Sequence, residues 1–158
     1  MSYQYPQWFR WWLFPGTYLV HFIDELVSAG GLPAWMARLG LAPMSTRQFV
    51  VASLFALVAA TVTGWVVRKG KPDWLVFALT ATLVLNALAH LTLSFATRSY
   101  SPGTASGVLL WLPLGAAILW RGSVHTSRRS LTIGLIIGIG VNVMIGVITV
   151  TLGLGRLG

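Results

Sequence analysis

The chain has 158 residues, of which 56% are hydrophobic and only 9% charged, and its mean hydropathy is +0.76. A soluble domain carries about 25% charged residues, so this composition excludes an ordinary soluble globular protein. The formal net charge of +8 does not indicate nucleic-acid binding, because the basic residues lie at the ends of apolar segments and form no single patch. There is no cysteine, which excludes disulfides and cysteine-ligated metals.

Five apolar segments are long enough to cross a bilayer, which takes roughly 20 residues of helix. The predicted spans are about 12–29, 49–67, 74–96, 102–120 and 131–154. The segment 31–47 contains Gly and Pro and is predicted to be an interfacial loop with a short amphipathic helix. These segments use nearly the whole chain. The sequence therefore predicts an all-α fold over residues 1–158, a single integral membrane domain built as a polytopic bundle of about five transmembrane helices.

The distribution of basic residues predicts the orientation. The N-terminus and two loops on the same side hold seven of them: Arg10, Arg68, Lys69, Lys71, Arg121, Arg128 and Arg129. The other side holds four: Arg38, Arg47, Arg98 and Arg156. Because cytoplasmic loops carry the excess of Lys and Arg, we expect a cytoplasmic N-terminus and an outside C-terminus. Short Arg-rich loops and compact size are typical of a bacterial inner-membrane protein.

The first span carries charged residues inside the stretch "YLVHFIDELVS", residues 18–28. His21, Asp24 and Glu25 lie three or four residues apart or adjacent, so they share one face of a helix. Two of the three acidic residues of the chain are here. Ionisable residues within a span are costly and usually face an interior site. This face of the first span is therefore predicted to line a functional site.

Polar residues of the third and fifth spans fall at a similar depth. Asn86 and His90 are four apart in the third span, and Asn142 interrupts a ridge of glycines in the fifth, a pattern that lets another helix come close. Spans one, three and five should run in the same direction. A rise of about 1.5 Å per residue then brings their polar groups into one layer, just beyond the midplane toward the outside.

The turn between spans three and four is expected to form the mouth of this site. Its polar residues are Tyr100, Ser101, Thr104 and Ser106. Trp111 is the tryptophan placed to line a pocket, and Pro113 predicts a kink in the fourth span.

These residues resemble the HXXEE-domain family of integral membrane proteins. The founding motif appears as "HFIDE", residues 21–25, and the family's Asn-x-x-x-His appears as "NALAH", residues 86–90. The segments "GGLPAWMARLG", "MSTRQF" and "RSYSPGTASGVLLWLPLG" are also similar, so the likeness covers roughly residues 11–120. One position departs from the family name, since Asp24 stands where Glu is implied. The resemblance implies a shared site and names no reaction.

The residue types in the predicted site are those of a metal centre. Neutral imidazole and carboxylate are standard zinc ligands, and three protein ligands plus water make a catalytic site. His21 and Glu25 at i, i+4 can converge on one ion, and His90 can supply the third ligand. Glu25 and Asp24 are the candidate catalytic residues, Asp24 by orienting His21 or a ligand water. Asn86, Tyr100 and Asn142 are candidates for substrate binding.

The first hypothesis is therefore a membrane-embedded, metal-dependent hydrolase with zinc, iron or manganese as the divalent cofactor. Its site would lie between spans one and three in the outer half of the bilayer. Its substrate would be a membrane lipid or another lipophilic small molecule, and a homo-oligomer is compatible with the sequence.

Three alternatives use the same residues. The first is a purely structural polar cluster, although buried ionic clusters are usually poor stabilisers. The second is a metal-free acid–base isomerase in which His21 and Glu25 exchange protons. The third is proton-linked transport or binding of a small ligand, because chains of carboxylates and histidines serve as proton relays.

Overall fold

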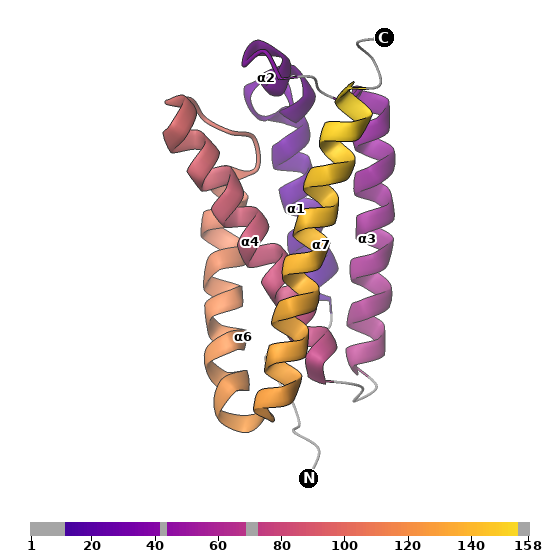
Figure 1. Cartoon of the computed structure of the whole chain (residues 1–158), viewed down its shortest axis with the longest axis vertical. Helices are drawn as coiled ribbons and strands as arrows, with labels where there is room; N and C mark the ends of the chain where they lie inside the picture. The colour runs from indigo at the N-terminus through magenta and orange to yellow at the C-terminus, as the bar shows by residue number, and fades with distance from the viewer. Residues whose placement is uncertain (1–11, 42–43, 69–72, 155–158) are drawn as a thin grey trace.

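The computed structural model describes residues 12–41, 44–68 and 73–154, and the regular elements in this part of the chain are all helical (Figure 1). In chain order they are α1 (Leu13–Val27), η1 (Ser28–Gly30), α2 (Leu32–Arg38), α3 (Thr46–Arg68), α4 (Asp73–Thr97), α5 (Thr104–Ser106), η2 (Gly107–Trp111), α6 (Leu112–His125) and α7 (Arg128–Leu154). The predicted all-α bundle is confirmed. Four of the basic residues used to predict orientation, Arg10, Lys69, Lys71 and Arg156, lie outside the described residues.

Within the described residues, four helical segments are long and apolar enough to cross a membrane. They are Thr46–Arg68, Asp73–Thr97, Thr104–Gly122 and Arg128–Ile148. The first predicted span is shorter than expected, since α1 has 15 residues, which at 1.5 Å per residue is about 22 Å against a hydrocarbon core of about 30 Å. The 3-10 turn η1 ends it, and Ala29 there has a φ of +51°. The predicted short helix within 31–47 is α2.

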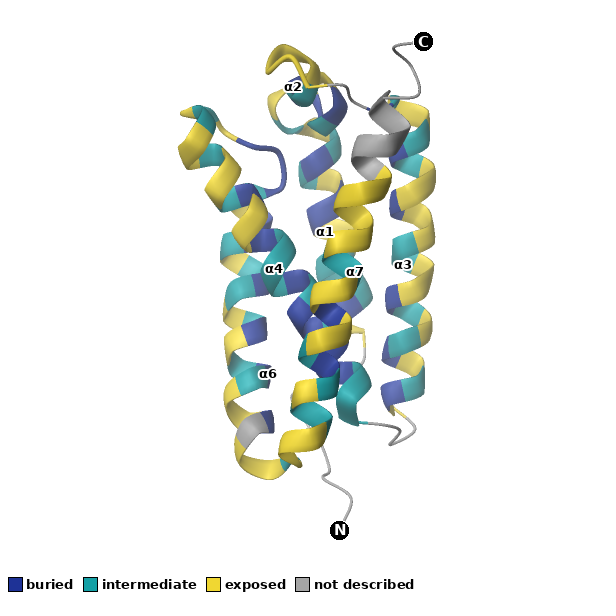
Figure 2. Cartoon of the chain, in the orientation of Figure 1, coloured by how far each residue is buried: buried dark blue, intermediate teal, exposed yellow. Residues whose placement is uncertain are grey.

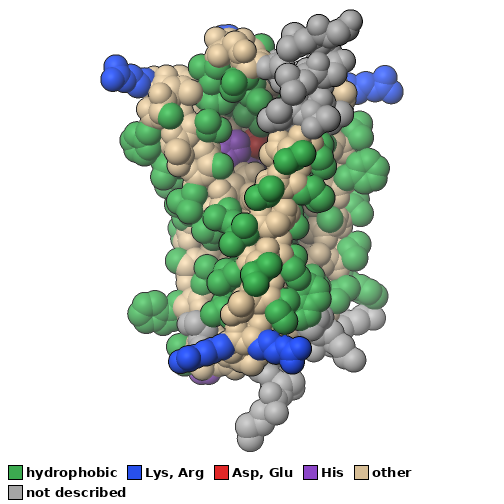
Figure 3. All heavy atoms as spheres, viewed as in Figure 1, with side chains coloured by type: hydrophobic (Ala, Val, Ile, Leu, Met, Phe, Trp, Pro, Cys, Tyr) green, Lys and Arg blue, Asp and Glu red, His purple; other side chains and the backbone are tan. Residues whose placement is uncertain are grey.

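The surface of the bundle is that of a membrane protein. Figure 3 shows a broad belt of hydrophobic side chains around the middle, with Lys and Arg gathered at the two ends. Large apolar side chains project outward, for example Phe55 (73% exposed) on α3, Phe95 (76%) on α4 and Trp120 (78%) on α6. Figure 2 shows the buried residues concentrated on the faces that the helices turn toward one another. A soluble monomer rarely exposes apolar surface on this scale.

Helix α4 is the centre of the bundle, and α7 makes the most extensive contact with it. The small-residue ridge of α7 produces this contact. A β-carbon on Gly138 would lie 2.5 Å from Ala81 Cβ and 2.7 Å from the Ala78 carbonyl oxygen, so only glycine lets the two backbones approach this closely. Gly134 meets α4 one turn earlier, near Trp74. Residues later in α7 contact residues later in α4. The two helices therefore run parallel, as predicted for the third and fifth spans.

The fourth membrane segment packs antiparallel to α4. Its Gly107 lies against Ala87, and its Gly122 lies against Phe77, which comes earlier in α4. The kink predicted at Pro113 stays a prediction; just before this residue the structure has the π-helical turn η2, where the Leu112 N–H donates to the Gly107 carbonyl. Proline has no N–H to continue a regular helical ladder, and π turns are found mostly as single turns, often at functional sites.

The main hydrophobic core lies where α1, α3, α4, η2 and α6 meet. It contains Phe14, Val67, Val76, Leu83, Ala87, Trp111 and Ile118. Trp111 and Phe14 are 2% and 0% exposed. Because Trp111 belongs both to this core and to the polar site described next, the core forms the floor of the site.

Candidate functional site

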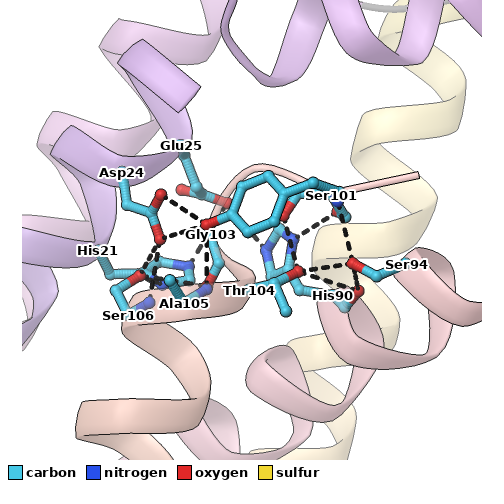
Figure 4. Close-up of polar contacts among 11 residues, drawn as sticks. His21, Asp24, Glu25, His90, Ser94, Ser101, Gly103, Thr104, Ala105 and Ser106 are labelled. Atoms are coloured by element: carbon cyan, nitrogen blue, oxygen red, sulfur yellow. Dashed lines mark hydrogen bonds and ion pairs between the residues drawn. The ribbon is translucent and has the colours of Figure 1, made fainter. Parts of the chain in front are cut away.

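The site is formed where α1 and α4 meet the turn that joins α4 to α5. The turn closes on itself through two hydrogen bonds, from the Ser101 N–H to Ser94 Oγ (2.9 Å) and from Thr104 Oγ1 to the Ser101 carbonyl (2.7 Å). Gly103 makes the reversal possible, since its φ of +93° is a conformation that residues with a β-carbon rarely adopt. The turn is thereby brought beside the polar face of α1 (Figure 4).

Three side chains converge at the centre of the site. His90 Nε2 lies 3.0 Å and His21 Nε2 lies 3.5 Å from the same atom, Glu25 Oε1. One ligand atom from each of the three residues lies within 4.8 Å of the others. All three residues are buried, with exposed fractions of 1% for His21, 7% for Glu25 and 6% for His90. The structure thus brings together the three residues predicted as metal ligands, two from α1 and one from α4.

The outer nitrogen of each imidazole is held by a serine, that of His21 by Ser106 of α5 and that of His90 by Ser101 of the turn. His21 Nδ1 lies 2.9 Å from Ser106 Oγ, and His90 Nδ1 lies 3.1 Å from Ser101 Oγ. With Nδ1 engaged outward, both rings direct Nε2 toward Glu25. Histidines that bind metals almost always make such a hydrogen bond through the other ring nitrogen, which fixes the ring orientation.

Asp24 connects α1 to the turn. Its Oδ2 accepts hydrogen bonds from the Ser106 N–H (3.0 Å) and from Ser106 Oγ (2.7 Å). Its Oδ1 accepts from Tyr100 OH (3.0 Å) and from Ser28 Oγ (2.5 Å). The predicted orienting residue thus reaches His21 through Ser106. Burial raises the pKa of the Tyr100 phenol, and the neighbouring Asp24 carboxylate raises it further, so the Tyr100 hydroxyl keeps its proton and remains a donor.

Two residues enclose the three converging side chains. The Trp111 indole lies on His21, with ring centroids 3.7 Å apart and an angle of 31° between the planes. Gly103 covers another side, because a β-carbon there would lie 2.8 Å from His21 Cε1, 2.9 Å from Glu25 Cγ and 3.1 Å from His90 Cε1. On the face viewed in Figure 3, a histidine and a carboxylate are visible at the bottom of a hollow bordered by hydrophobic side chains. The site is therefore closed on two sides and is visible from the surface near the α2 end of the apolar belt (Figure 3).

Asn86 and Asn142, the two asparagines predicted to bind substrate, lie at different depths in the bundle. Asn86 lies one turn before His90 on α4, and its Oδ1 is buried without a hydrogen-bond partner among the described residues. Asn142 donates to the carbonyls of Thr82 (3.1 Å) and Gly138 (3.0 Å). Thr82 precedes His90 by two turns, about 12 Å along the helix. The structure thus places Asn142 at the α4–α7 contact and not beside the three converging side chains.

The turn contributes more than the mouth that the sequence predicts. Ser101 and Ser106 make direct contact with the histidines, and Gly103 lies against all three central residues. In the sequence they form a run of small residues, "SPGTAS", between two spans, within one of the segments that resemble the HXXEE family. Such a run predicts a tight turn, but it does not indicate which face of which helix the turn will cover.

Comparison with known proteins places the site in a sequence family. The model of a family described as a protein of unknown function with HXXEE motif matches residues 12–118. The match contains the three converging residues, the turn and Trp111. Searches among curated proteins and among solved structures each found no match.

Proposed function

The chain belongs to the HXXEE family, and from the geometry of its buried site we propose that it is a membrane-embedded, metal-dependent enzyme. The observation that carries this proposal is the convergence of His21 Nε2, His90 Nε2 and Glu25 Oε1 within 4.8 Å. Two imidazoles and one carboxylate are the protein ligands of several catalytic zinc sites, which keep a fourth position for water or substrate. Iron and manganese also accept these ligands.

An unsatisfied atom at the centre of the site supports a bound cation. His21 Nε2 is buried and has no hydrogen-bond partner among the described residues, and its 3.5 Å separation from Glu25 Oε1 is long for a hydrogen bond. A buried polar atom without a partner costs roughly 1–3 kcal/mol. A cation between the three ligand atoms would satisfy this nitrogen and would neutralise Glu25, whose charge is otherwise expensive inside a membrane.

The proposed reaction is hydrolysis of a membrane lipid or another lipophilic substrate. A divalent metal supplies Lewis acidity and lowers the pKa of a bound water to about 7. The chain itself holds the metal through His21, Glu25 and His90, and Trp111 and Gly103 keep bulk water from two sides. Tyr100 and Asn86 offer polar groups to a substrate. The hollow bordered by hydrophobic side chains (Figure 3) supports a substrate that arrives from the lipid phase.

The proposal includes the orientation and setting expected from the sequence. The N-terminus would be cytoplasmic and the C-terminus outside, in a bacterial inner membrane. The turn at residues 98–103 then faces the outer side, and a substrate would come from the outer leaflet. Association with further copies of the chain is compatible with this arrangement.

Elemental analysis of the purified, tag-free protein in mild detergent tests the proposal. We expect about one zinc, iron or manganese per chain in the wild type. The single variants His21→Ala, Glu25→Gln and His90→Ala should each lose it while remaining folded. The matched control is His125→Ala, which removes the third histidine of the chain, an exposed residue at the end of α6, and it should retain the metal.

Two results would overturn metal-dependent chemistry. One is the absence of metal from the wild type after controlled reloading, and the other is full metal content in all three site variants. Either result would favour the metal-free isomerase, with His21 and Glu25 as a proton pair, or proton-linked transport and ligand binding. Proton flux into liposomes that carry the wild type but not Glu25→Gln would then identify transport.

A further inference from the structure

Asp24 and Ser106 form a chain of hydrogen bonds that ends on His21 Nδ1. We infer that these two residues hold His21 in the tautomer with its proton on Nδ1, which leaves the lone pair of Nε2 directed at the centre of the site. The inference deepens the proposed function and rests on it where it concerns a metal. The tautomer itself is a property of the chain without any ligand.

The argument begins with the single proton of the Ser106 hydroxyl. Ser106 Oγ lies 2.7 Å from Asp24 Oδ2 and 3.1 Å from the Gly103 carbonyl oxygen. A carboxylate and a carbonyl only accept hydrogen bonds, so the hydroxyl proton points to one of them. What Ser106 Oγ then offers to His21 Nδ1, at 2.9 Å, is a lone pair. His21 Nδ1 must be the donor of this hydrogen bond.

The position of the Asp24 carboxylate is fixed by other donors. Ser28 Oγ and Tyr100 OH donate to Oδ1, and the Ser106 backbone N–H donates to Oδ2. Ser106 Oγ lies closer to Asp24 Oδ2 (2.7 Å) than to the Gly103 carbonyl oxygen (3.1 Å), and a hydrogen bond to a carboxylate is the stronger of the two. The chain of contacts Asp24–Ser106–His21 therefore runs in one direction, with each hydrogen bond donated toward Asp24.

His21 Nε2 has no hydrogen-bond partner among the described residues, as expected if the ring carries its proton on Nδ1. A protonated Nε2 would be a donor, and Glu25 Oε1 would be its nearest acceptor, yet the two atoms are 3.5 Å apart and form no hydrogen bond. His90 Nε2 approaches the same oxygen to 3.0 Å. The two histidines are thus unequal. Asp24 and Ser106 act as positioning residues for His21, which of these two histidines is the one that presents a bare Nε2 to the centre of the site.

The tautomer can be measured directly. The full-length protein, labelled with nitrogen-15 in its three histidines and stripped of metal with a chelator, is examined by NMR in detergent, and each ring is assigned by the loss of its signals in His21→Ala, His90→Ala or His125→Ala. We expect His21 to show a protonated Nδ1 and a bare Nε2. A wild-type His21 ring protonated on Nε2 would overturn the inference, whatever the variants show.

Substitutions at the serines separate positioning from general structural effects. Ser106→Ala should shift His21 toward the Nε2-protonated form and weaken zinc binding about 10- to 100-fold, the usual cost of losing such a partner. Ser106→Thr, which keeps the hydroxyl, should restore both properties. Ser101→Ala is the matched control, since it alters only the partner of His90 and should leave the His21 signals unchanged.

The outcomes distinguish this inference from the proposed function. If the wild type binds no zinc but His21 is protonated on Nδ1, the proposed metal chemistry fails and the positioning role stands. If zinc binds at His21 and Ser106→Ala changes neither the tautomer nor the affinity, the positioning role fails and the metal centre stands.

Discussion

Gly103 lies so close to His21 that a β-carbon on residue 103 would be 2.8 Å from His21 Cε1. The contact joins the tightest point of the turn after α4 to the middle of α1, 82 positions earlier in the chain. Because the same carbon would also crowd Glu25 and His90, the absence of a side chain at this one position is what lets the three ligand atoms meet.

Gly103→Ala should therefore damage the site as well as the backbone. A non-glycine residue in this conformation costs roughly 1–3 kcal/mol, and forcing a methyl group into a packed interior adds roughly 1–3 kcal/mol. Gly40→Ala is the matched control, because Gly40 also has a positive φ of +72° but nothing within 4 Å of its β position. Thermal unfolding and metal content in detergent check this. Equal destabilisation of the two variants, with metal retained in both, would contradict it.

The contact between α4 and α7 should depend on Gly138 in particular. Gly138→Ala places a methyl group against Ala81 and the Ala78 carbonyl, and we expect a loss of roughly 1–3 kcal/mol in unfolding free energy. Gly140→Ala, two residues away in open space, should be neutral or stabilise by roughly 0.5–1 kcal/mol, as alanine favours helix. Unfolding of both variants in mixed detergent micelles provides the measurement. A more stable Gly138→Ala protein would rule out close packing at this point.

Asn142→Leu should affect stability and leave the metal unchanged. The change removes the hydrogen bond to the Thr82 carbonyl, and such interhelical bonds in membranes contribute on average about 0.6 kcal/mol. Metal content should equal that of the wild type, because the amide lies two turns from His90. Loss of turnover on an identified substrate, with stability intact, would instead support the substrate-binding role predicted from the sequence.

Ionisation of Tyr100 should lower the stability of the folded protein at alkaline pH. Its pKa is raised in the folded protein by burial and by Asp24, so folding favours the protonated phenol. The contribution of the Tyr100 phenol to the free energy of unfolding is complete below about pH 10, the pKa of tyrosine in the unfolded chain. It is lost as the pH rises through the higher pKa of Tyr100 in the folded protein. Since Tyr100 is 42% exposed, solvent screens the effect. The difference in unfolding midpoint between the wild type and Tyr100→Phe should stay the same from about pH 8 to about pH 10 and shrink above about pH 10; a difference that stays constant up to about pH 11 would contradict it.

Much of the fold follows from the hydrophobic pattern. Runs of about 20 apolar residues with basic ends determine where α3, α4 and α7 begin and end to within a few residues, because the bilayer imposes the length. The length of α1 was less predictable. Its apolar run continues past Val27 to Ala29, but the backbone already turns at Ser28–Gly30, a local conformation that hydropathy does not report.

The central residues of the site were predictable for a different reason. His21, Glu25 and His90 are the kind of residue that a membrane excludes unless they face each other, so their chemistry alone suggested that they meet. Asn142 shows the limit of this reasoning. If the third and fifth spans began at the same depth in the membrane, Asn142 would lie beside Asn86. The packing of the α7 glycines on α4 instead places Asn142 beside Thr82, one helical turn before Asn86.

The orienting role of the turn could not be predicted. Ser106 and His21 are 85 residues apart, and serine is common both in turns and in spans. Their contact depends on the positive φ of Gly103 and on the direction in which the chain leaves α4. Both are properties of three-dimensional packing, and periodicity within a single helix carries no information about them.

The π-helical turn η2 has a consequence for how this protein can be altered. A π turn adds one residue to a helical segment, which rotates everything before it by about 100° relative to everything after it. Ser106 precedes this step, and the α6 glycines that pack on α4 follow it. Removal of one residue from Gly107–Trp111 would take out this extra residue, so Ser106 would be rotated relative to the α6 glycines and would lose its contact with His21. The extra residue therefore sets the rotation at which the segment presents Ser106 to His21 at one end and its glycines to α4 at the other.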